Sequence, residues 1–134
     1  MTSFPLKIVT PDGMCFDGQA EELLVRTTGG DVAILARHIN YVAALGMGRA
    51  VVVTGGERRY AACIGGMLSV IDGEVTLVPT TFEWANEIDI DRVEASLTRA
   101  NKVLKSNDSS ATDIKLAEAR LHRALVRKSV VSNK

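Results

Sequence analysis

The chain changes its pattern at the ten residues Glu83-Trp84-Ala85-Asn86-Glu87-Ile88-Asp89-Ile90-Asp91-Arg92. Before this stretch, apolar residues alternate with polar ones or form short blocks separated by glycine, which is typical of short strands. After it, no glycine or proline occurs, and apolar residues recur three and four positions apart, as they do along one face of a helix. The sequence therefore predicts a β unit over residues 1–85 and a helical unit over residues 86–134.

The first part contains eight strand-like segments with turn signals between nearly all of them. Pro11-Asp12-Gly13, Gly55-Gly56 and Asp72-Gly73 supply the preset or positive φ angles that tight connections need. Because no helix-length segment separates the strands, we expect an antiparallel β-sandwich. The segments are 6–10, 14–16, 20–27, 31–35, 50–54, 57–64, 67–71 and 74–79, and the ambiguous stretch 38–45 could hold a short helical turn.

The second part predicts an antiparallel hairpin of two helices. Asn86 or Asp89 is placed to cap the first helix, and Ser110-Ala111-Thr112-Asp113 has the form of a capping box that starts the second. Trp84, beside Phe82, is expected to pack the helices onto the sheet. Three alanines make the seam thin, so its burial stabilises the hairpin by only a few kcal/mol, at about 0.8 kcal/mol per methylene. The seam residues are Ile90, Val93, Leu97, Ala100, Leu104, Ile114, Ala117, Leu121 and Ala124.

Charge is distributed unevenly along this chain of 134 residues, although its formal net charge is zero. After Thr98 there are 9 Lys and Arg residues against 3 Asp and Glu residues. This excess favours an acidic partner surface or a phosphate-bearing ligand over a purely structural helix, and a solvated face remains an alternative. No aromatic residue is interleaved with these charges, so nucleic acid is not expected. One hypothesis is that the hairpin opens and places a basic face on another subunit, using Arg99, Lys102, Arg120, Arg123 and Arg127.

No motif of an active site occurs in the sequence, which lacks the common hydrolase, metalloprotease and nucleotide-hydrolysing patterns. His38 and His122 are too few and too far apart to predict a metal site. Cys15 and Cys63 have no C-x-x-C spacing, so two buried thiols are expected instead of a disulfide or metal ligands. No apolar run approaches the roughly 20 residues that span a bilayer, and no signal-peptide profile is present.

Five motifs in order resemble the epsilon subunit of bacterial F-type ATP synthases. They are Thr10-Pro11-Asp12-Gly13, then Gly29-Gly30-Asp31-Val32-Ala33-Ile34-Leu35 with His38, Gly65-Gly66-Met67, Glu83, and Ile88-Asp89-Ile90-Asp91-Arg92. The resemblance implies a sandwich of about ten strands followed by two antiparallel helices. Ala36-Arg37 stands where the family usually has Pro-Gly, so this loop is less constrained by proline.

The resemblance also implies a noncatalytic part of the rotating central stalk, peripheral to the cytoplasmic face of the bacterial plasma membrane. In the family the sandwich binds the gamma subunit and the ring of c subunits, and couples ion flow to rotation. Gly30, Asp31 and His38 match the region of that contact. The helical tail extends toward the alpha and beta subunits in the family and inhibits ATP hydrolysis.

Some family members bind ATP on the folded hairpin as a regulatory ligand, although no cofactor is required. Glu83, Ile88, Asp89 and Arg92 match that motif, while Val93 replaces its alanine. Val93 would crowd the nucleotide if it faced the ligand, and would only widen the seam if it faced the second helix. Arg120, Arg123 and Arg127 are candidates for phosphate contacts by charge and planar geometry.

Two other classes of function remain as alternatives to this assignment. One is a free nucleotide-sensing or scaffold module of the same architecture, which would not form a tight complex with gamma. The other is an independent hydrolase that uses Cys15 or Cys63 with His38. Neither cysteine has the electropositive, partly exposed setting that reactive thiolates need, which argues against the hydrolase.

Overall fold

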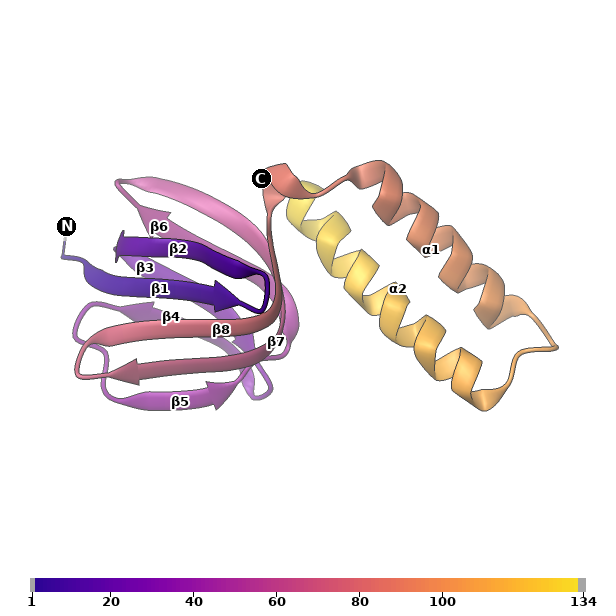
Figure 1. The fold of residues 1–134 in the computed structure, drawn as a ribbon, viewed down its shortest axis with the longest axis horizontal. Helices are drawn as coiled ribbons and strands as arrows, with labels where there is room; N and C mark the ends of the chain where they lie inside the picture. The colour runs from indigo at the N-terminus through magenta and orange to yellow at the C-terminus, as the bar shows by residue number, and fades with distance from the viewer. Residues whose placement is uncertain (1, 133–134) are drawn as a thin grey trace.

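A computed structural model describes residues 2–132, and it places a β-sandwich beside a projecting helical hairpin (Figure 1). The chain runs through eight strands before a short 3-10 helix and two α-helices. The strands are β1 (Phe4–Thr10), β2 (Gly13–Ala20), β3 (Glu22–Thr27), β4 (Gly30–Leu35), β5 (Tyr41–Ala44), β6 (Met47–Thr54), β7 (Glu57–Ile71) and β8 (Glu74–Trp84). The helices are η1 (Ala85–Glu87), α1 (Ile90–Lys105) and α2 (Ala111–Ser132).

Two long strands, β7 and β8, are shared by the two layers of the sandwich. The order of hydrogen-bonded strands is β2-β1-β8-β7-β6-β3-β4, and β5 pairs with the second half of β7. Pairing of β7 with β8 is interrupted between Ile64↔Thr81 and Gly66↔Pro79, where both strands turn from one layer to the other. Counting each half separately gives five strands per layer, which reconciles eight continuous strands with the expected ten.

Gly66 forms this corner because a side chain does not fit there. Its φ angle is +101°, and an added Cβ would lie 2.1 Å from the carbonyl oxygen of Val78. Segments 57–64 and 67–71, expected as separate strands, are therefore one strand with a sharp bend. Glycine at such a position combines a bend of the strand with close approach of a second backbone.

Two details of the strand prediction are corrected. Residues 41–44 of the ambiguous stretch form β5 and not a helical turn, because they pair with β7 from Tyr41↔Val70 to Ala44↔Met67. The sandwich is mostly but not wholly antiparallel, since β1 and β8 pair in parallel. In the preceding loop Arg37 has a φ of 66°, so it takes the left-handed conformation for which glycine is better suited.

The core of the sandwich contains no helix residue. Alternation sets its composition, as in β1, where Phe4, Leu6 and Ile8 are buried and the residues between them are exposed. Trp84 belongs to this core, where its ring meets Phe82 edge-on with a centroid distance of 4.9 Å. The expectation that Trp84 packs the helices onto the sheet is therefore wrong.

A separate small cluster joins the hairpin to the sandwich. Val126 and Val130 of α2 are buried against Ala62 of β7 and Ala85 of η1. The main helix-to-sheet packing comes from α2 on β6 and β7, while α1 packs mainly on α2. None of the helices in residues 2–132 is long and apolar enough to cross a membrane.

Both predicted helix starts are confirmed. The carboxylate of Asp89 accepts hydrogen bonds from the backbone N–H groups of Asp91 and Arg92, and so caps α1. Ser110 and Asp113 form the reciprocal bonds of the capping box at the start of α2. Of the seam, Val93, Leu97, Ala100, Ala117 and Ala124 are buried, whereas Ile90 is 38% exposed.

Candidate functional site

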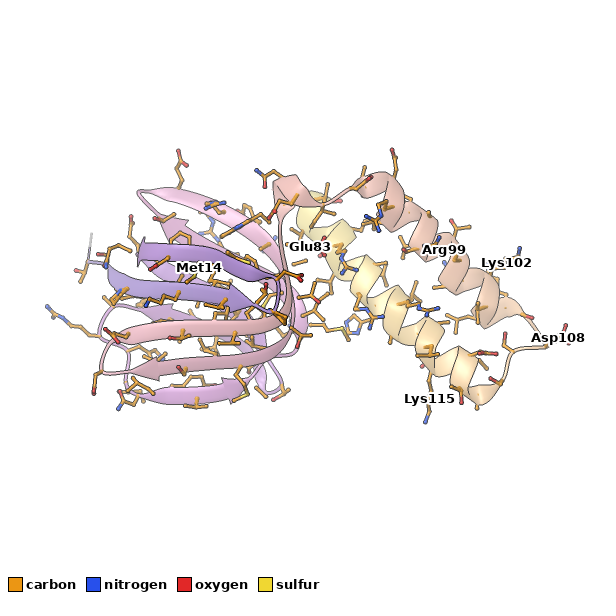
Figure 2. All side chains as sticks on the ribbon, viewed as in Figure 1. Met14, Glu83, Arg99, Lys102, Asp108 and Lys115 are labelled. Atoms are coloured by element: carbon orange, nitrogen blue, oxygen red, sulfur yellow. The ribbon has the colours of Figure 1, made fainter. Side chains whose placement is uncertain are left out.

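The candidate site begins where β8 leaves the sandwich. Strand alternation directs Phe82 and Trp84 into the core, and it places Glu83 on the outer side. η1 then turns the chain toward α1, and the Glu87 carboxylate accepts a hydrogen bond from the backbone N–H of Trp84. Glu83 consequently lies at the junction of the sandwich and the hairpin (Figure 2).

A small pocket at this junction collects most of the residues of the nucleotide motif. Its volume is about 240 Å³, slightly below the roughly 300–1,000 Å³ typical of ligand pockets. It is too small to enclose a whole nucleoside triphosphate. We call it the proximal pocket, and it is lined by Glu83, Glu87, Ile88, Asp89, Arg92, Val93, Ser96, Ala124 and Arg127.

The charged groups of the proximal pocket already have partners. Arg127 of α2 donates from Nε to a carboxylate oxygen of Glu83, with 2.5 Å between the atoms. Asp89 accepts two backbone N–H groups at the start of α1, so those amides are not free to bind a phosphate. Any phosphate in the pocket would have to rest on arginine side chains, of which Arg92 makes no ion pair among the described residues.

Val93 faces the helix seam. It is 5% exposed and is buried with Leu97 and Ala124, while Ile88 and Leu121 pack against the same cluster. Of the two orientations considered for this residue, the one toward the second helix is therefore the one adopted. Since Val93 also borders the proximal pocket, its methyl groups still limit the depth of that pocket.

A second hollow continues the cleft between the helices, away from the sandwich. Its volume is about 580 Å³, it carries Arg99, Lys102 and Arg120, and Ser96 lines both hollows. We call it the distal pocket (Figure 2 labels Arg99 and Lys102). Arg92, Ser96 and Arg99 follow at spacings of four and three, so one helix face presents them together. That spacing is the signal in the sequence by which Arg99 could have been added to the predicted nucleotide residues.

The predicted nucleotide residues are thus divided among three places. Five of them line the proximal pocket: Glu83, Ile88, Asp89, Arg92 and Arg127. Arg120 lines the distal pocket, and Arg123 borders neither. The geometry supports a cleft with carboxylates at the sandwich end and cations along its length.

The predicted interface residues do not lie together. Gly30 and Asp31 begin β4, and His38 follows its end, so a strand of six residues, roughly 20 Å long, separates them. The Asp31 carboxylate pairs with Arg26 at 3.1 Å. The His38 ring meets Tyr41 edge-on and hydrogen-bonds the carbonyl of Ile39 through Nδ1. An interface of standard size, about 800 Å² per partner, is wide enough to include both ends of β4, so the predicted contact with gamma or the c-ring stays a prediction.

The two cysteines differ in burial. Both are free thiols, but Cys63 is buried in the sandwich core and Cys15 is only partly buried, so the expectation of two buried thiols is met by Cys63 alone. Burial raises the pKa of the Cys63 thiol from 9.0 to about 12, because the charged thiolate is poorly solvated there. Cys63 therefore remains protonated near neutral pH, and this opposes the hydrolase alternative.

Comparison with known proteins decides the family. Residues 3–85 match the model described as the beta-sandwich domain of the ATP synthase Delta/Epsilon chain, and residues 86–132 match its long alpha-helix domain. The chain belongs to the ATP synthase epsilon family. It is 40% identical over 135 aligned positions to the "ATP synthase epsilon chain" of Ruminococcus albus, with all of both chains covered.

Other members of the epsilon family give the same result. The Bacillus cytotoxicus protein is 36% identical, with both chains fully covered, and the Clostridium novyi protein is 38% identical, with 96% of this chain and 98% of that one covered. The predicted family is confirmed. An epsilon chain is a noncatalytic subunit, and it belongs to the central stalk of ATP synthase.

Two solved structures share the fold. One is the cryo-EM structure of Euglena gracilis mitochondrial ATP synthase, OSCP/F1/c-ring, with a TM-score of 0.83 at 22% identity; 96% of this chain and 81% of that chain are covered. The other is the central stalk/c-ring of Tetrahymena thermophila mitochondrial ATP synthase, with a TM-score of 0.60 at 15% identity and 95% of each chain covered. At these identities the likeness concerns the fold alone.

Proposed function

We propose that this epsilon chain couples rotation to ATP synthesis through its sandwich and inhibits ATP hydrolysis through its hairpin. The sandwich docks on gamma and the c-ring, at the cytoplasmic face of the bacterial plasma membrane, and the hairpin acts on alpha and beta. The observation that carries the proposal is the division of the chain into two units. The sandwich core contains no helix residue, and one small cluster joins the hairpin to it.

An apolar row on the outer face of the sandwich is the proposed gamma surface. Strand register places Ala44 beside Met67, Met67 beside Val78, and Val9 beside Met14. Val9 follows Ile8, the parallel partner of Leu77, and so lies next to Val78. The row therefore crosses β5, β7, β8, β1 and β2, and Met14, Met67 and Val78 are 56%, 46% and 45% exposed. Exposed apolar patches of this kind are typical of protein interfaces.

Replacing Met67 with glutamate is expected to weaken binding to gamma by about tenfold or more, because a charge would be buried in the apolar contact. Co-purification of the full chain with gamma measures this effect. Leu125→Glu is the matched control, since Leu125 is 48% exposed but lies on α2, outside the row. Equal loss of gamma binding in both variants would remove the row as the docking surface.

The hairpin is the proposed inhibitory element because it concentrates the positive charge. Arg99 and Lys102 of α1 and Arg120 of α2 line the distal pocket, where they are available to an acidic partner surface. Opening of the hairpin toward beta would carry these residues with it. The excess of cations after Thr98 supports this direction of binding.

ATP is the proposed regulatory ligand of the folded hairpin. The proximal pocket alone is too small, but the distal pocket adjoins it at Ser96 and supplies three further cations. The phosphates would meet arginines along the cleft, while Asp89 and Glu83 would accept hydrogen bonds from the nucleoside. The distribution of charge therefore supports a nucleotide whose base lies toward the sandwich.

Calorimetric titration of the isolated chain with ATP is expected to show saturable heat. Arg92→Gln should weaken binding by about tenfold, because it removes a charge-assisted hydrogen bond. Arg37→Gln is the control, because Arg37 lies in the loop after β4, outside both pockets. The absence of heat at millimolar ATP would end the nucleotide proposal, and it would leave docking and inhibition untouched.

A further inference from the structure

We infer that the hairpin is held closed by a latch that needs no nucleotide. The α2 latch consists of Arg127 paired with Glu83, flanked by Val126 and Val130 seated on the sandwich. Its regulatory meaning rests on the proposed inhibitory role of the hairpin, but its existence requires neither ATP nor the assembled enzyme. This contact must break before the hairpin can leave the sandwich.

The attachment of the hairpin is one-sided. α2 packs on β6, β7 and η1, whereas α1 packs mainly on α2. Figure 1 shows the end of α2 against the sandwich and the connection between the helices far from it. Release of the last turns of α2 would therefore free the hairpin from the sandwich, even if α1 and α2 stayed paired.

The apolar part of the latch is one turn of one helix face. Val126 and Val130 are four residues apart, so they point to the same side, and they are 8% and 0% exposed. They sit on Ala62 and Ala85, whose small side chains allow the helix to approach the sheet closely. Met47, Tyr60 and Ile88 also pack against this cluster, so the apolar part supplies most of the buried area and the ionic part adds to its stability.

The ionic part joins α2 to the rigid end of β8. The side chains of Arg127 and Glu83 are 26% and 32% exposed, less than those of the Lys128–Glu94 pair at 47% and 51%. Lower exposure reduces solvent screening, so the first pair stabilises its contact more than the second. Glu83 is held in place by Trp84, whose indole N–H donates to the carbonyl of Cys15. Arg127 therefore binds a fixed point on the sandwich.

The latch and the proximal pocket share both Arg127 and Glu83. A phosphate that recruited Arg127, or a nucleoside group that bound Glu83, would have to replace part of an existing ion pair. Val93 adds to closure independently of any ligand, since it is buried against Leu97 and Ala124 in the seam. In this chain the hairpin is thus closed without nucleotide. A ligand would stabilise the closed state only by the amount by which its binding free energy exceeds that of the ion pair it replaces.

Hydrogen exchange of the backbone amides of α2 tests the latch in the full chain without nucleotide. Glu83→Gln and Arg127→Gln are each expected to speed exchange in the last two turns of α2 by about ten- to a hundredfold, the range for a hydrogen bond between charged groups. The double variant Glu83→Gln/Arg127→Gln should not exchange substantially faster than either single variant, because each substitution removes the same contact. Glu94→Gln is the control and is expected to change exchange by less than about fivefold, since its ion pair is exposed.

The exchanged pair Glu83→Arg/Arg127→Glu provides a second test that does not depend on loss of structure. It should restore slow exchange at least in part, as a true ion pair would. Single variants that exchange no faster than Glu94→Gln, or two single effects that simply add in the double variant, would overturn the latch. If the exchanged pair restored slow exchange but the rate of ATP hydrolysis were the same with and without the hairpin, the latch would stand and its regulatory role would be rejected.

Discussion

Replacing Gly66 with alanine is expected to destabilise the sandwich by roughly 3–5 kcal/mol, the range of severe steric and backbone effects. The new Cβ would lie 2.1 Å from the carbonyl oxygen of Val78 and 2.6 Å from the Cα of Pro79. Both are backbone atoms in the partner strand, so no side-chain rotation relieves the clash. Urea denaturation followed by the fluorescence of Trp84, which lies in the sandwich core, measures the loss.

Gly56→Ala is the matched control for this prediction. Gly56 also has a positive φ, +79°, but an added Cβ would meet nothing within 4 Å. Its cost is therefore the conformational term alone, about 1–2 kcal/mol. If both substitutions lowered the free energy of unfolding equally, the corner at Gly66 would not be the close backbone contact described above.

Local signals explain which parts of the fold were predictable. The helix starts at Asp89 and Ser110 depend on residues within one turn, so the sequence alone located both. β5 depends instead on pairing with a strand more than twenty residues away, and its four residues carry little pattern of their own. The Gly65-Gly66 pair lies between two segments that were expected to be separate strands. Only tertiary structure could show that it bends one strand instead of ending it.

The candidate site, too, was predictable only where it depends on residues that are close in the chain. Glu83, Ile88, Asp89 and Arg92 are close in the chain, and a single turn from strand to helix brings them together. Arg127 is 44 residues from its partner Glu83, so its charge made it a candidate for phosphate contacts but could not show its pairing with Glu83. Trp84 was misplaced although the alternation in β8 contains the answer, because Phe82 and Trp84 share the core side.

Removing residues 88–134 is expected to raise ATP hydrolysis by the assembled enzyme about fivefold or more, the usual scale of a regulatory coupling. The deletion takes away the basic hairpin, with Arg99, Lys102 and Arg120, while every residue of the sandwich core remains. The shortened chain should therefore still fold and still occupy its place on gamma. Co-purification of the shortened chain with gamma confirms that occupancy and is the necessary control.

The rate of ATP hydrolysis with the full chain and with the shortened chain, each bound to gamma, tests the central claim most directly. We predict a faster rate with the shortened chain and unchanged recovery of gamma. Equal rates at low and high ATP, with gamma still bound, would contradict inhibition by the hairpin and leave only the docking role of the sandwich.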